Sequence, residues 1–330
     1  MKHYNLAVVG ATGMVGRKML EVLAERKLPI GNFYAFASPR SAGSAITFCG
    51  KQYTVIELTE ENIKAQPLDF AIFSAGGETS RVFAPIFAAA GCIVVDNSSQ
   101  WRMDPSVPLV VPEVNPDALK SHANIIANPN CSTIQAVVAL APLHRRYGIK
   151  RIVYSTYQAV SGAGLAGWTD LENGVKGMPP QKFSRPIFGN VIPQIDVFLD
   201  NGYTKEEDKM IRETRKILGD ESLKITATTV RVPVYNGHSE SVNIEFKRKP
   251  ALSVVRKILK SSPGITVVDD IKRGKFPTPL DCSGRDDVFV GRIRLDDSVK
   301  NGLNLWVVSD NIRKGAATNA VQIVETLIRG

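Results

Sequence analysis

The stretch that decides the fold is Tyr4-Asn5-Leu6-Ala7-Val8-Val9-Gly10-Ala11-Thr12-Gly13-Met14-Val15-Gly16. It begins with a short apolar run, as a buried strand does, and a glycine-rich turn follows at once. From residue 15 to residue 26, apolar side chains recur at helical spacing. A strand, a glycine-rich turn and a helix in this order predict a dinucleotide-binding unit, because glycine lets the backbone approach a pyrophosphate at the start of a helix. The alternative is an ordinary strand-to-helix turn.

Alternating strands and helices continue to about residue 130 and predict an α/β Rossmann domain. Beyond it, runs of strands with segregated helices predict an α+β domain with a mixed sheet. The expected strands cover residues 33–37, 69–74, 92–96, 109–111, 149–159, 225–234, 239–246, 288–295 and 303–308, with a hairpin or short strands over 47–58. The expected helices cover residues 79–90, 132–143, 205–218, 253–261 and 315–328. Residues 235–238 are expected to turn the chain into a return strand, and the Gly- and Pro-rich residues 166–200 to form a loop-rich arm that faces a partner.

Composition sets the class of protein. The chain has 330 residues, 44% of them hydrophobic and 22% charged, which suits a globular protein of about two domains. Its four cysteines show no CxxC spacing, so we expect neither a metal site nor a disulfide framework, and a reducing cytoplasm fits best. The longest uncharged stretch, residues 123–143, contains several Asn, Ser and Gln residues and makes a poor membrane span.

The net charge of +9 has three interpretations: nucleic-acid binding, a site for phosphorylated ligands, or solubility. The basic residues are scattered and form no stripe interleaved with aromatic residues, so we expect no nucleic-acid partner. Charge alone does not decide between the other two.

The end of the second expected strand bears on the choice of cofactor. NAD-binding sites usually carry a carboxylate there, whereas this chain has Ser38-Pro39-Arg40-Ser41. An arginine flanked by hydroxyl groups suits the 2′-phosphate of NADP. The alternative is a solvated loop arginine. Ala75 and Gly76 follow the expected strand 69–74, at the edge of the sheet where ligands bind.

Three residues are candidates for chemistry. Cys131 precedes a predicted helix, where backbone N–H groups favour a thiolate, although free cysteines are often buried structural residues. Arg102 follows a strand end and is either an anion clamp or a surface salt bridge. His238 lies in a Gly-rich turn after a strong strand and is either an acid–base group or a surface or capping residue.

Several motifs together make the chain resemble the aspartate-semialdehyde dehydrogenase family over nearly its whole length. They are the Gly10–Gly16 turn, Asn128-Pro129-Asn130-Cys131-Ser132-Thr133, Gln158-Ala159-Val160-Ser161-Gly162-Ala163-Gly164, Glu206-Glu207-Asp208-Lys209, and Arg231-Val232-Pro233-Val234 with Gly237-His238. The resemblance implies that NADPH reduces L-aspartyl-4-phosphate to L-aspartate-4-semialdehyde and phosphate through a thioester. This step belongs to the aspartate pathway to lysine (through diaminopimelate), threonine, methionine and isoleucine.

The resemblance also implies roles for matched positions. Cys131 corresponds to the nucleophile, His238 to the acid–base group and Gln158 to the glutamine that orients the substrate. Arg231 corresponds to the arginine that grips the substrate carboxylate, and Glu206 to the acid that faces its amino group. Lys209 and Arg102 correspond to phosphate-binding residues, and Asn130 to a further substrate residue. The adjacent Glu207 leaves the assignment of Glu206 open, and an exposed ion pair is the alternative for Glu206 and Lys209.

Cofactor residues and assembly follow from the same resemblance. The implied NADP-binding residues are Gly10, Thr12, Gly13, Met14, Val15, Gly16, Ser38, Arg40, Ser41, Ala75, Gly76, Ser161, Gly162, Ala163, Gly164 and Asn311. The implied organisation is a NADP-binding domain over residues 1–130, joined by the C-terminal helix 311–330, and a catalytic and dimerisation domain over residues 131–310. The implied assembly is a homodimer or a dimer of dimers. Two other hypotheses remain: a reductase of other acyl phosphates, and a catalytically silent relative.

Overall fold

The computed structural model describes residues 2–329, which divide into two compact units. Unit 1 comprises the chain up to Pro129 and the segment from Ala316 onward, and unit 2 is Asn130–Gly315. The chain passes from one unit to the other between residues 129 and 130 and again between residues 315 and 316.

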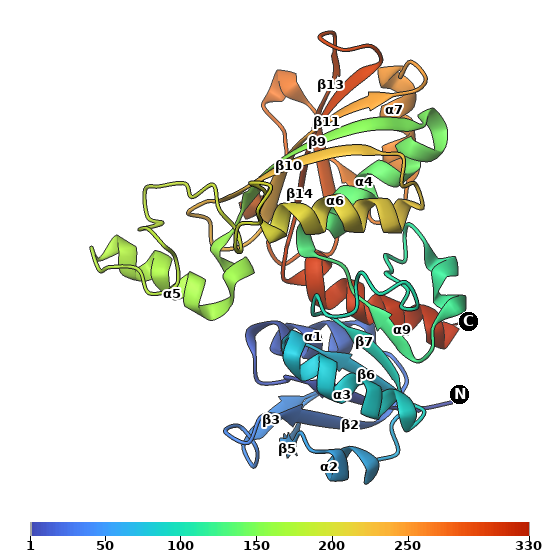
Figure 1. The fold of residues 1–330 in the computed structure, drawn as a ribbon, viewed down its shortest axis with the longest axis vertical. Coiled ribbons are helices and arrows are strands. Elements are labelled where there is room, and N and C mark those ends of the chain that lie inside the picture. Colours follow the sequence, from blue (N-terminus) through green and yellow to red (C-terminus); the bar gives the residue numbers. More distant parts are fainter. Residues whose placement is uncertain (1, 330) are drawn as a thin grey trace. The chain divides into compact units, whose positions relative to one another are not determined.

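Unit 1 is built on a parallel sheet with the strand order β5-β2-β1-β6-β7-β8 (Figure 1). Its elements are β1 (Tyr4–Val9), α1 (Met14–Arg26), β2 (Ile30–Ala37), β3 (Ala45–Phe48), β4 (Lys51–Thr54), β5 (Ile56–Glu57), α2 (Glu60–Lys64), β6 (Phe70–Phe73), α3 (Gly77–Ala89), β7 (Ile93–Asp96), the 3₁₀ helix η1 (Pro116–Ser121), β8 (Ile125–Ala127) and α9 (Asn319–Arg329). This is the doubly wound Rossmann order, whose switch point lies between β1 and β6. The predicted fold class is confirmed.

The glycine-rich turn is required by close backbone contacts at that switch point. Gly10 has φ +81°, and a Cβ atom there would lie 2.4 Å from the Ser74 carbonyl oxygen at the end of β6. A Cβ atom on Gly16 would lie 2.2 Å from the Gly10 carbonyl oxygen. Real Cβ atoms do not approach so closely, so only glycine lets α1 pack against this turn.

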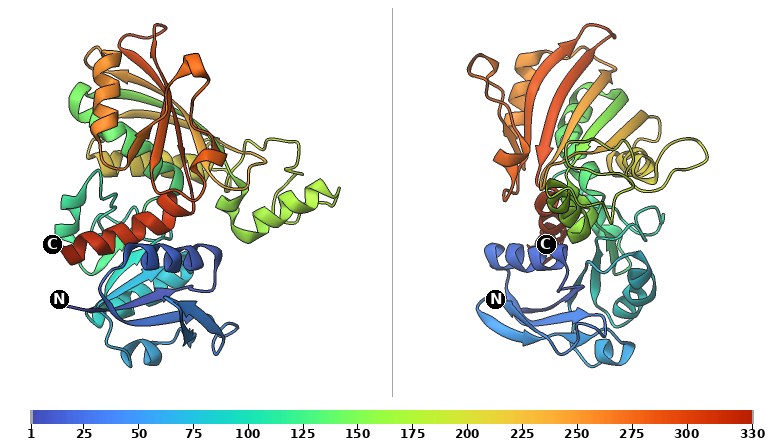
Figure 2. Two further views of the ribbon diagram at one scale, coloured as in Figure 1. Left: turned by 180° about the vertical axis from the view of Figure 1, so that it is seen from behind. Right: turned by 90° about the vertical axis from the view of Figure 1, so that its left-hand side faces the viewer.

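The last helix of the chain belongs to unit 1. Helix α9 packs beside α1, as Figure 2 also shows, and Arg26 forms an ion pair with Glu325 at 2.5 Å. The Asn319 side chain donates to Asn128 Oδ1 at 2.7 Å and to the Val110 carbonyl oxygen at 3.0 Å. These buried hydrogen bonds join the C-terminal segment to the stretch that leads out of unit 1.

Unit 2 contains a mixed sheet with the strand order β10-β9-β11-β14-β13-β12. Its elements are α4 (Cys131–Tyr147), β9 (Ile149–Gln158), η2 (Val160–Ala163), α5 (Gly164–Val175), α6 (Lys205–Leu218), β10 (Lys224–Arg231), β11 (His238–Phe246), α7 (Leu252–Ser261), β12 (Ile265–Val267), η3 (Ile271–Arg273), α8 (Pro279–Cys282), β13 (Val288–Asp296) and β14 (Gly302–Ser309). A π-helical segment, η4 (Arg313–Thr318), crosses back into unit 1. Helix α4 packs on β11 and β14, and α6 packs on β10.

The register of the sheet arranges buried polar side chains in rows. Arg231 pairs with Gln158 in β9, and His238 pairs with Ser309 in β14. Because Ser239 pairs with Tyr157, His238 and Gln158 also lie at one level of the sheet. We call Ser309, His238, Gln158 and Arg231 the upper row.

A second row lies two residues further into the sheet, on the same buried face. Glu240 pairs with Thr156, which pairs with Thr229. We call these three residues the lower row. All are fully buried.

Two predictions about local structure are wrong. Residues 109–111 form an isolated bridge from Leu109 to Ala127, because the segment lies beside β8 for one residue only. The turn at residues 235–238 does not make a hairpin: β9 lies between β10 and β11, and β10 pairs with β9 in parallel. His238 is therefore the first residue of β11 and is fully buried. The alternative of a surface histidine is wrong.

Within residues 2–329, no helix is long and apolar enough to cross a membrane. The same residues contain no group of three or more His, Cys, Asp or Glu side chains that could hold a metal ion.

The lower row leads to a prediction about pH and stability. Neither carboxyl oxygen of Glu240 has a hydrogen-bond partner among residues 2–329, and burial, together with the charge of Glu206, raises its pKa well above 4.5. The folded chain therefore holds this proton more tightly than the unfolded chain does. This contribution to the free energy of unfolding is complete below pH 4.5 and is lost as the pH rises toward the native pKa.

We expect Glu240→Gln to become progressively more stable than the wild type as the pH rises. Each pH unit between the two pKa values costs the wild type about 1.4 kcal/mol, whereas glutamine cannot ionise. Urea denaturation from about pH 5 to pH 8 measures the difference. Glu221→Gln, at an exposed position, is the control. A difference that does not change with pH would contradict the prediction.

Candidate active site

Unit 1 has a cavity of about 460 Å³ at the carboxyl ends of its central strands. The predicted cofactor residues Gly10, Thr12, Gly13, Ser38 and Ala75 line it. Residues that the sequence analysis did not single out also line it: Ala37, Pro39, Leu58, Ser74, Thr79 and Phe83. The lining is glycine-rich and mostly apolar, and the cavity lies at the switch point of the sheet. These properties suit a dinucleotide.

The other cofactor candidates of unit 1 are close in sequence to the residues that line this cavity. Met14, Val15 and Gly16 begin α1, and Gly76 precedes α3. Thr12 Oγ1 donates to Ser41 Oγ at 3.5 Å, which ties the glycine-rich turn to the segment after β2. Arg40 is exposed in that segment.

Arg102 is buried in unit 1 and donates from Nη2 to the Asn97 carbonyl oxygen at 2.9 Å. The alternative of a surface salt bridge is therefore wrong. The hydrogen bond holds the guanidinium group beside the loop that follows β7.

In unit 2, Cys131 is the first residue of α4 and is half-buried. Asn130 caps the helix: its Oδ1 accepts from the N–H groups of Ser132 at 3.0 Å and Thr133 at 3.2 Å. The cap satisfies donors that the first turn leaves open. The thiol therefore begins a well-capped helix, where the helix dipole favours negative charge.

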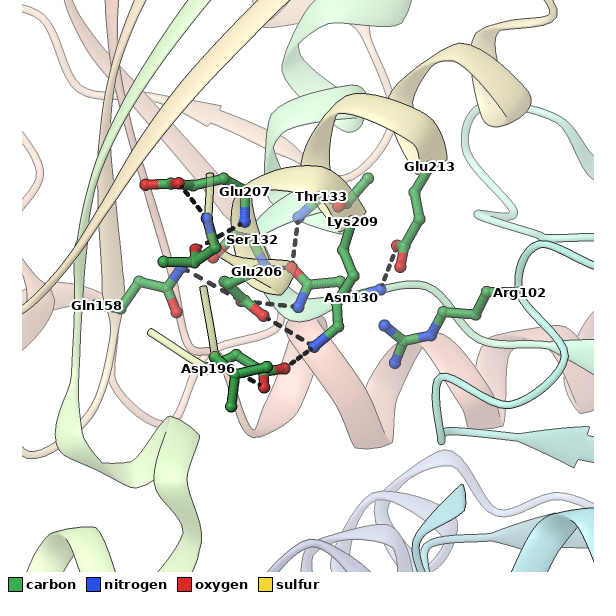
Figure 3. Close-up of polar contacts among 12 residues, drawn as sticks. Arg102, Asn130, Ser132, Thr133, Gln158, Asp196, Glu206, Glu207, Lys209 and Glu213 are labelled. Atoms are coloured by element: carbon green, nitrogen blue, oxygen red, sulfur yellow. Dashed lines mark hydrogen bonds and ion pairs between the residues drawn. The ribbon is translucent and has the colours of Figure 1, made fainter. Parts of the chain in front are cut away.

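Glu206 connects several candidate residues (Figure 3). Its Oε1 accepts from Asn130 Nδ2 at 2.8 Å and from Gln158 Nε2 at 3.4 Å, and its Oε2 pairs with Lys209 Nζ at 3.3 Å. Lys209 also pairs with Asp196 at 2.8 Å. Because Glu206 is buried and bonded to two amides, the alternative of an exposed ion pair is wrong for it. Glu207 instead accepts from backbone N–H groups of Thr204 and Thr229, so Glu206 is the one of the two that faces the other candidates.

Arg231 and His238 meet at the chain segment that follows β9. Arg231 Nη1 donates to the Ala159 carbonyl oxygen at 2.6 Å, and the Ala159 N–H donates to His238 Nδ1 at 3.0 Å. A Cβ atom on Gly162 would lie 2.7 Å from Arg231 Nη1 and 3.2 Å from His238 Nε2. Gly162 therefore leaves space in front of both side chains.

These contacts determine the charge of each group. Because Nδ1 of His238 accepts a hydrogen bond, the proton of the neutral ring is assigned to Nε2. Burial, and then the charge of Arg231, lower the pKa of His238 well below 6.5. Burial also lowers the pKa of Arg231, while Glu206 and Cys131 act in the opposite direction. Cys131 and Glu206 are thus each close enough to Arg231 to interact with it electrostatically.

Asn311 holds the segment Ser161–Gly164, whose four residues are candidates for cofactor binding. Its side chain hydrogen-bonds Ser161 Oγ at 3.0 Å and accepts from the Gly237 N–H at 2.9 Å. Ser161, Gly162 and Ala163 form η2, and Gly164 begins α5. Asn311 therefore joins this segment to the residue before His238.

Three residues near the candidates were not predicted. Glu213 Oε2 accepts the Asn130 N–H at 2.7 Å, and Asp196 pairs with Lys209. A Cβ atom on Gly315 would lie 2.8 Å from the Cβ atom of Cys131. The sequence could have pointed to Glu213, because it lies seven residues after Glu206 on the same predicted helix and so on the same helix face. Asp196 and Gly315 carried no local signal.

Comparisons with known proteins agree with this arrangement. Residues 5–122 match the model of the semialdehyde dehydrogenase NAD-binding domain, and residues 140–314 match that of the semialdehyde dehydrogenase dimerisation domain. Aspartate-semialdehyde dehydrogenase of Aquifex aeolicus is 54% identical over 99% of this chain and 98% of its own.

Solved structures give the same result. Aspartate-semialdehyde dehydrogenase II of Vibrio cholerae, complexed with ASA, has a TM-score of 0.96 and 48% identity over 100% of this chain and 99% of its own. The Candida albicans enzyme with NADP has a TM-score of 0.78 and 28% identity over 99% of both chains. The resemblance inferred from the motifs is confirmed, and the chain belongs to the aspartate-semialdehyde dehydrogenase family.

Proposed function

We propose that the protein reduces L-aspartyl-4-phosphate to L-aspartate-4-semialdehyde and phosphate, with NADPH as reductant and a thioester on Cys131 as intermediate. The observation that carries the proposal is the position of Cys131: it begins a capped helix within electrostatic reach of Arg231. The product would enter the pathway to lysine, diaminopimelate, threonine, methionine and isoleucine.

Each side chain has a chemical task in this reaction. The Cys131 thiolate attacks the acyl carbonyl carbon, a carbon–sulfur bond forms, and the bond to phosphate breaks. Gln158 orients the acyl group, Arg231 binds the α-carboxylate and Glu206 binds the amino group, with Asn130 beside it. Lys209 and Arg102 bind phosphate.

His238 acts from its neutral state. Its Nε2–H donates a hydrogen bond to the acyl oxygen, where negative charge develops during attack. To accept a proton as a base, the ring would first have to give up the bond from the Ala159 N–H. The lowered pKa of His238 agrees with a neutral hydrogen-bond donor.

The residues of the cavity in unit 1 fit the proposed cofactor. Gly10 and Gly16 allow the close backbone packing that forms a tight glycine-rich turn, which suits a pyrophosphate. Arg40 with Ser38 and Ser41 suits a 2′-phosphate. The family resemblance also assigns Ser161–Gly164, a segment of unit 2 that Asn311 holds, to the cofactor. When bound, NADPH supplies the hydride that reduces the thioester.

Assembly as a homodimer or a dimer of dimers is part of the proposal. The match to a dimerisation domain supports it. Large apolar side chains that are more than half exposed in the arm over residues 166–200 also support it: Val175, Phe188, Val191, Val197 and Phe198. We place the protein in the cytoplasm, because its four cysteines, all within the described residues, are free.

We expect Cys131→Ala to lower kcat by at least about 10³-fold, because no other group can form the thioester. Oxidation of L-aspartate-4-semialdehyde with NADP and phosphate measures this, and mass spectrometry should detect an acyl adduct on Cys131 in the wild type. Cys49→Ser, at an exposed position, should keep full activity. Substantial turnover by Cys131→Ala would rule out the thioester.

We expect Arg40→Ala to raise KM for NADP by about tenfold to a hundredfold, because a charge-assisted bond to the 2′-phosphate is lost. KM for NAD should change little. Arg81→Ala, at another exposed arginine of unit 1 that pairs with Glu78, is the matched control. Equal losses for NADP and NAD would remove Arg40 from the specificity site.

We expect kcat to show no ionisation with a pKa near 6.5 that depends on His238, because this ring stays neutral above its lowered pKa. The pH profiles of the wild type and His238→Asn measure this. If His238→Asn abolished an acid limb near pH 6.5, the neutral-donor assignment would fail.

A further inference from the structure

One buried carboxyl group beside the nucleophile has no part in the proposed chemistry. Glu213 lies on α6, seven residues after Glu206, so both side chains leave the helix on the same face. Its side chain is buried, and Oε2 accepts the Asn130 N–H at 2.7 Å (Figure 3). A buried carboxyl group is costly unless it is hydrogen-bonded, so this contact needs an explanation.

The start of helix α6 contains a contact of the same kind as that between Glu213 and the Asn130 N–H. At its own start, Thr204 Oγ1 accepts the Glu207 N–H at 3.3 Å, and Glu207 Oε2 accepts the Thr204 N–H at 2.7 Å. This pair of reciprocal bonds is a capping box.

Helix α4 has only half of such a box within its own sequence. Asn130 Oδ1 accepts the Thr133 N–H, but the side chain of Thr133 is too short to reach back to the Asn130 N–H. Thr133 Oγ1 has no hydrogen-bond partner within residues 2–329. Glu213 supplies the missing acceptor from another helix, at the same 2.7 Å distance as Glu207 does in α6.

Asn130 is consequently held between two carboxyl groups of α6. Its side-chain amide donates to Glu206 at 2.8 Å and its backbone N–H to Glu213 at 2.7 Å. The next residue is Cys131, so the position of the Asn130 backbone decides where the thiol lies. A reacting group that is misplaced by about 1 Å can lose about 10²-fold in rate.

We propose that Glu213 is a positioning residue for Cys131, which completes the capping box of α4 from α6 and so holds the nucleophile in place. The inference rests on the proposed role of Cys131 as nucleophile. Glu213 touches the backbone of Asn130 and acts through it. What the role requires is an acceptor at the full length of a glutamate side chain, and not its charge.

Two conservative variants distinguish the effect of the length of the Glu213 side chain from the effect of its charge. Glu213→Gln keeps an oxygen acceptor at the same distance and removes the charge, whereas Glu213→Asp keeps the charge and withdraws the acceptor by one methylene group. Two readouts are needed: kcat and KM for L-aspartate-4-semialdehyde, and the rate at which iodoacetamide alkylates Cys131 without substrates across a pH range. Peptide mass spectrometry identifies the alkylated cysteine.

For Glu213→Asp we expect kcat and the alkylation rate to fall about tenfold or more, with KM changed little. Glu213→Gln should stay close to the wild type in both. The matched control is Glu207→Asp, which shortens a neighbouring buried acceptor that does not contact Asn130. It should lower thermal stability but leave the alkylation rate of Cys131 unchanged.

The inference is overturned if Glu213→Asp equals the wild type, if Glu213→Gln falls as far as Glu213→Asp, or if Glu207→Asp slows alkylation equally. The first result would show that Glu213 does not position Cys131. The second would show that the charge of Glu213 matters and not its reach. The third would show that the slower alkylation reflects a general loss of stability. Failure of the proposed function looks different: Cys131→Ala would then retain turnover, while the alkylation rates would still report whether Glu213 holds the thiol.

Discussion

The candidate active site depends on the register of three strands in unit 2. Arg231 pairs with Gln158, and the pairing of Ser239 with Tyr157 sets His238 at the same level. Side chains alternate between the two faces of a sheet, so a slip of one residue would turn all of these groups away from α4 and α6. The lower row, with Glu240, would turn with them. The hydrogen-bonding pattern of the strands thus decides which residues share the site. This strand register is strongly preferred, because the apolar face of the sheet is the one buried beneath the helices.

Cys131 belongs to the first turn of α4 and not to the sheet that carries this row. Its position depends on Asn130, which caps α4 with its side-chain oxygen and donates to Glu206 and Glu213 of α6. Glu206 also accepts from Gln158 on the sheet. The side-chain amide of Asn130 therefore links the start of α4 to Gln158 in the upper row through the carboxyl group of Glu206. A buried network of this kind is stable only when its members are paired. All three buried glutamates of α6 meet this condition: Glu206 and Glu213 accept from Asn130, and Glu207 accepts from Thr204 and Thr229.

Much of this could be predicted from local sequence. The glycine-rich turn identified the Rossmann domain, because strand, turn and helix follow one another within a few residues and each leaves its own pattern. The helix at residues 205–218 and the half-buried strand near residues 149–159 were predicted for the same reason. The strand at residues 109–111 and the hairpin at residues 225–246 were wrong, because a short apolar run and a turn do not state which strand lies alongside. The roles expected of Arg231, Gln158 and His238 came from the family resemblance and not from spacing.

By itself, then, the sequence determined most element types, the glycine-rich turn of the dinucleotide-binding domain, the family and the candidate residues for the chemistry. Only the tertiary structure decided that His238 is buried with its proton on Nε2, that Glu206 rather than Glu207 faces Asn130 and Gln158, and that Glu213 completes the cap of α4. The physical reason is the range of the interactions. Helical spacing, turns and glycine conformations act between neighbours in the chain, whereas strand register and hydrogen bonds such as that between Glu213 and Asn130 join residues far apart in sequence, and local patterns carry no record of them.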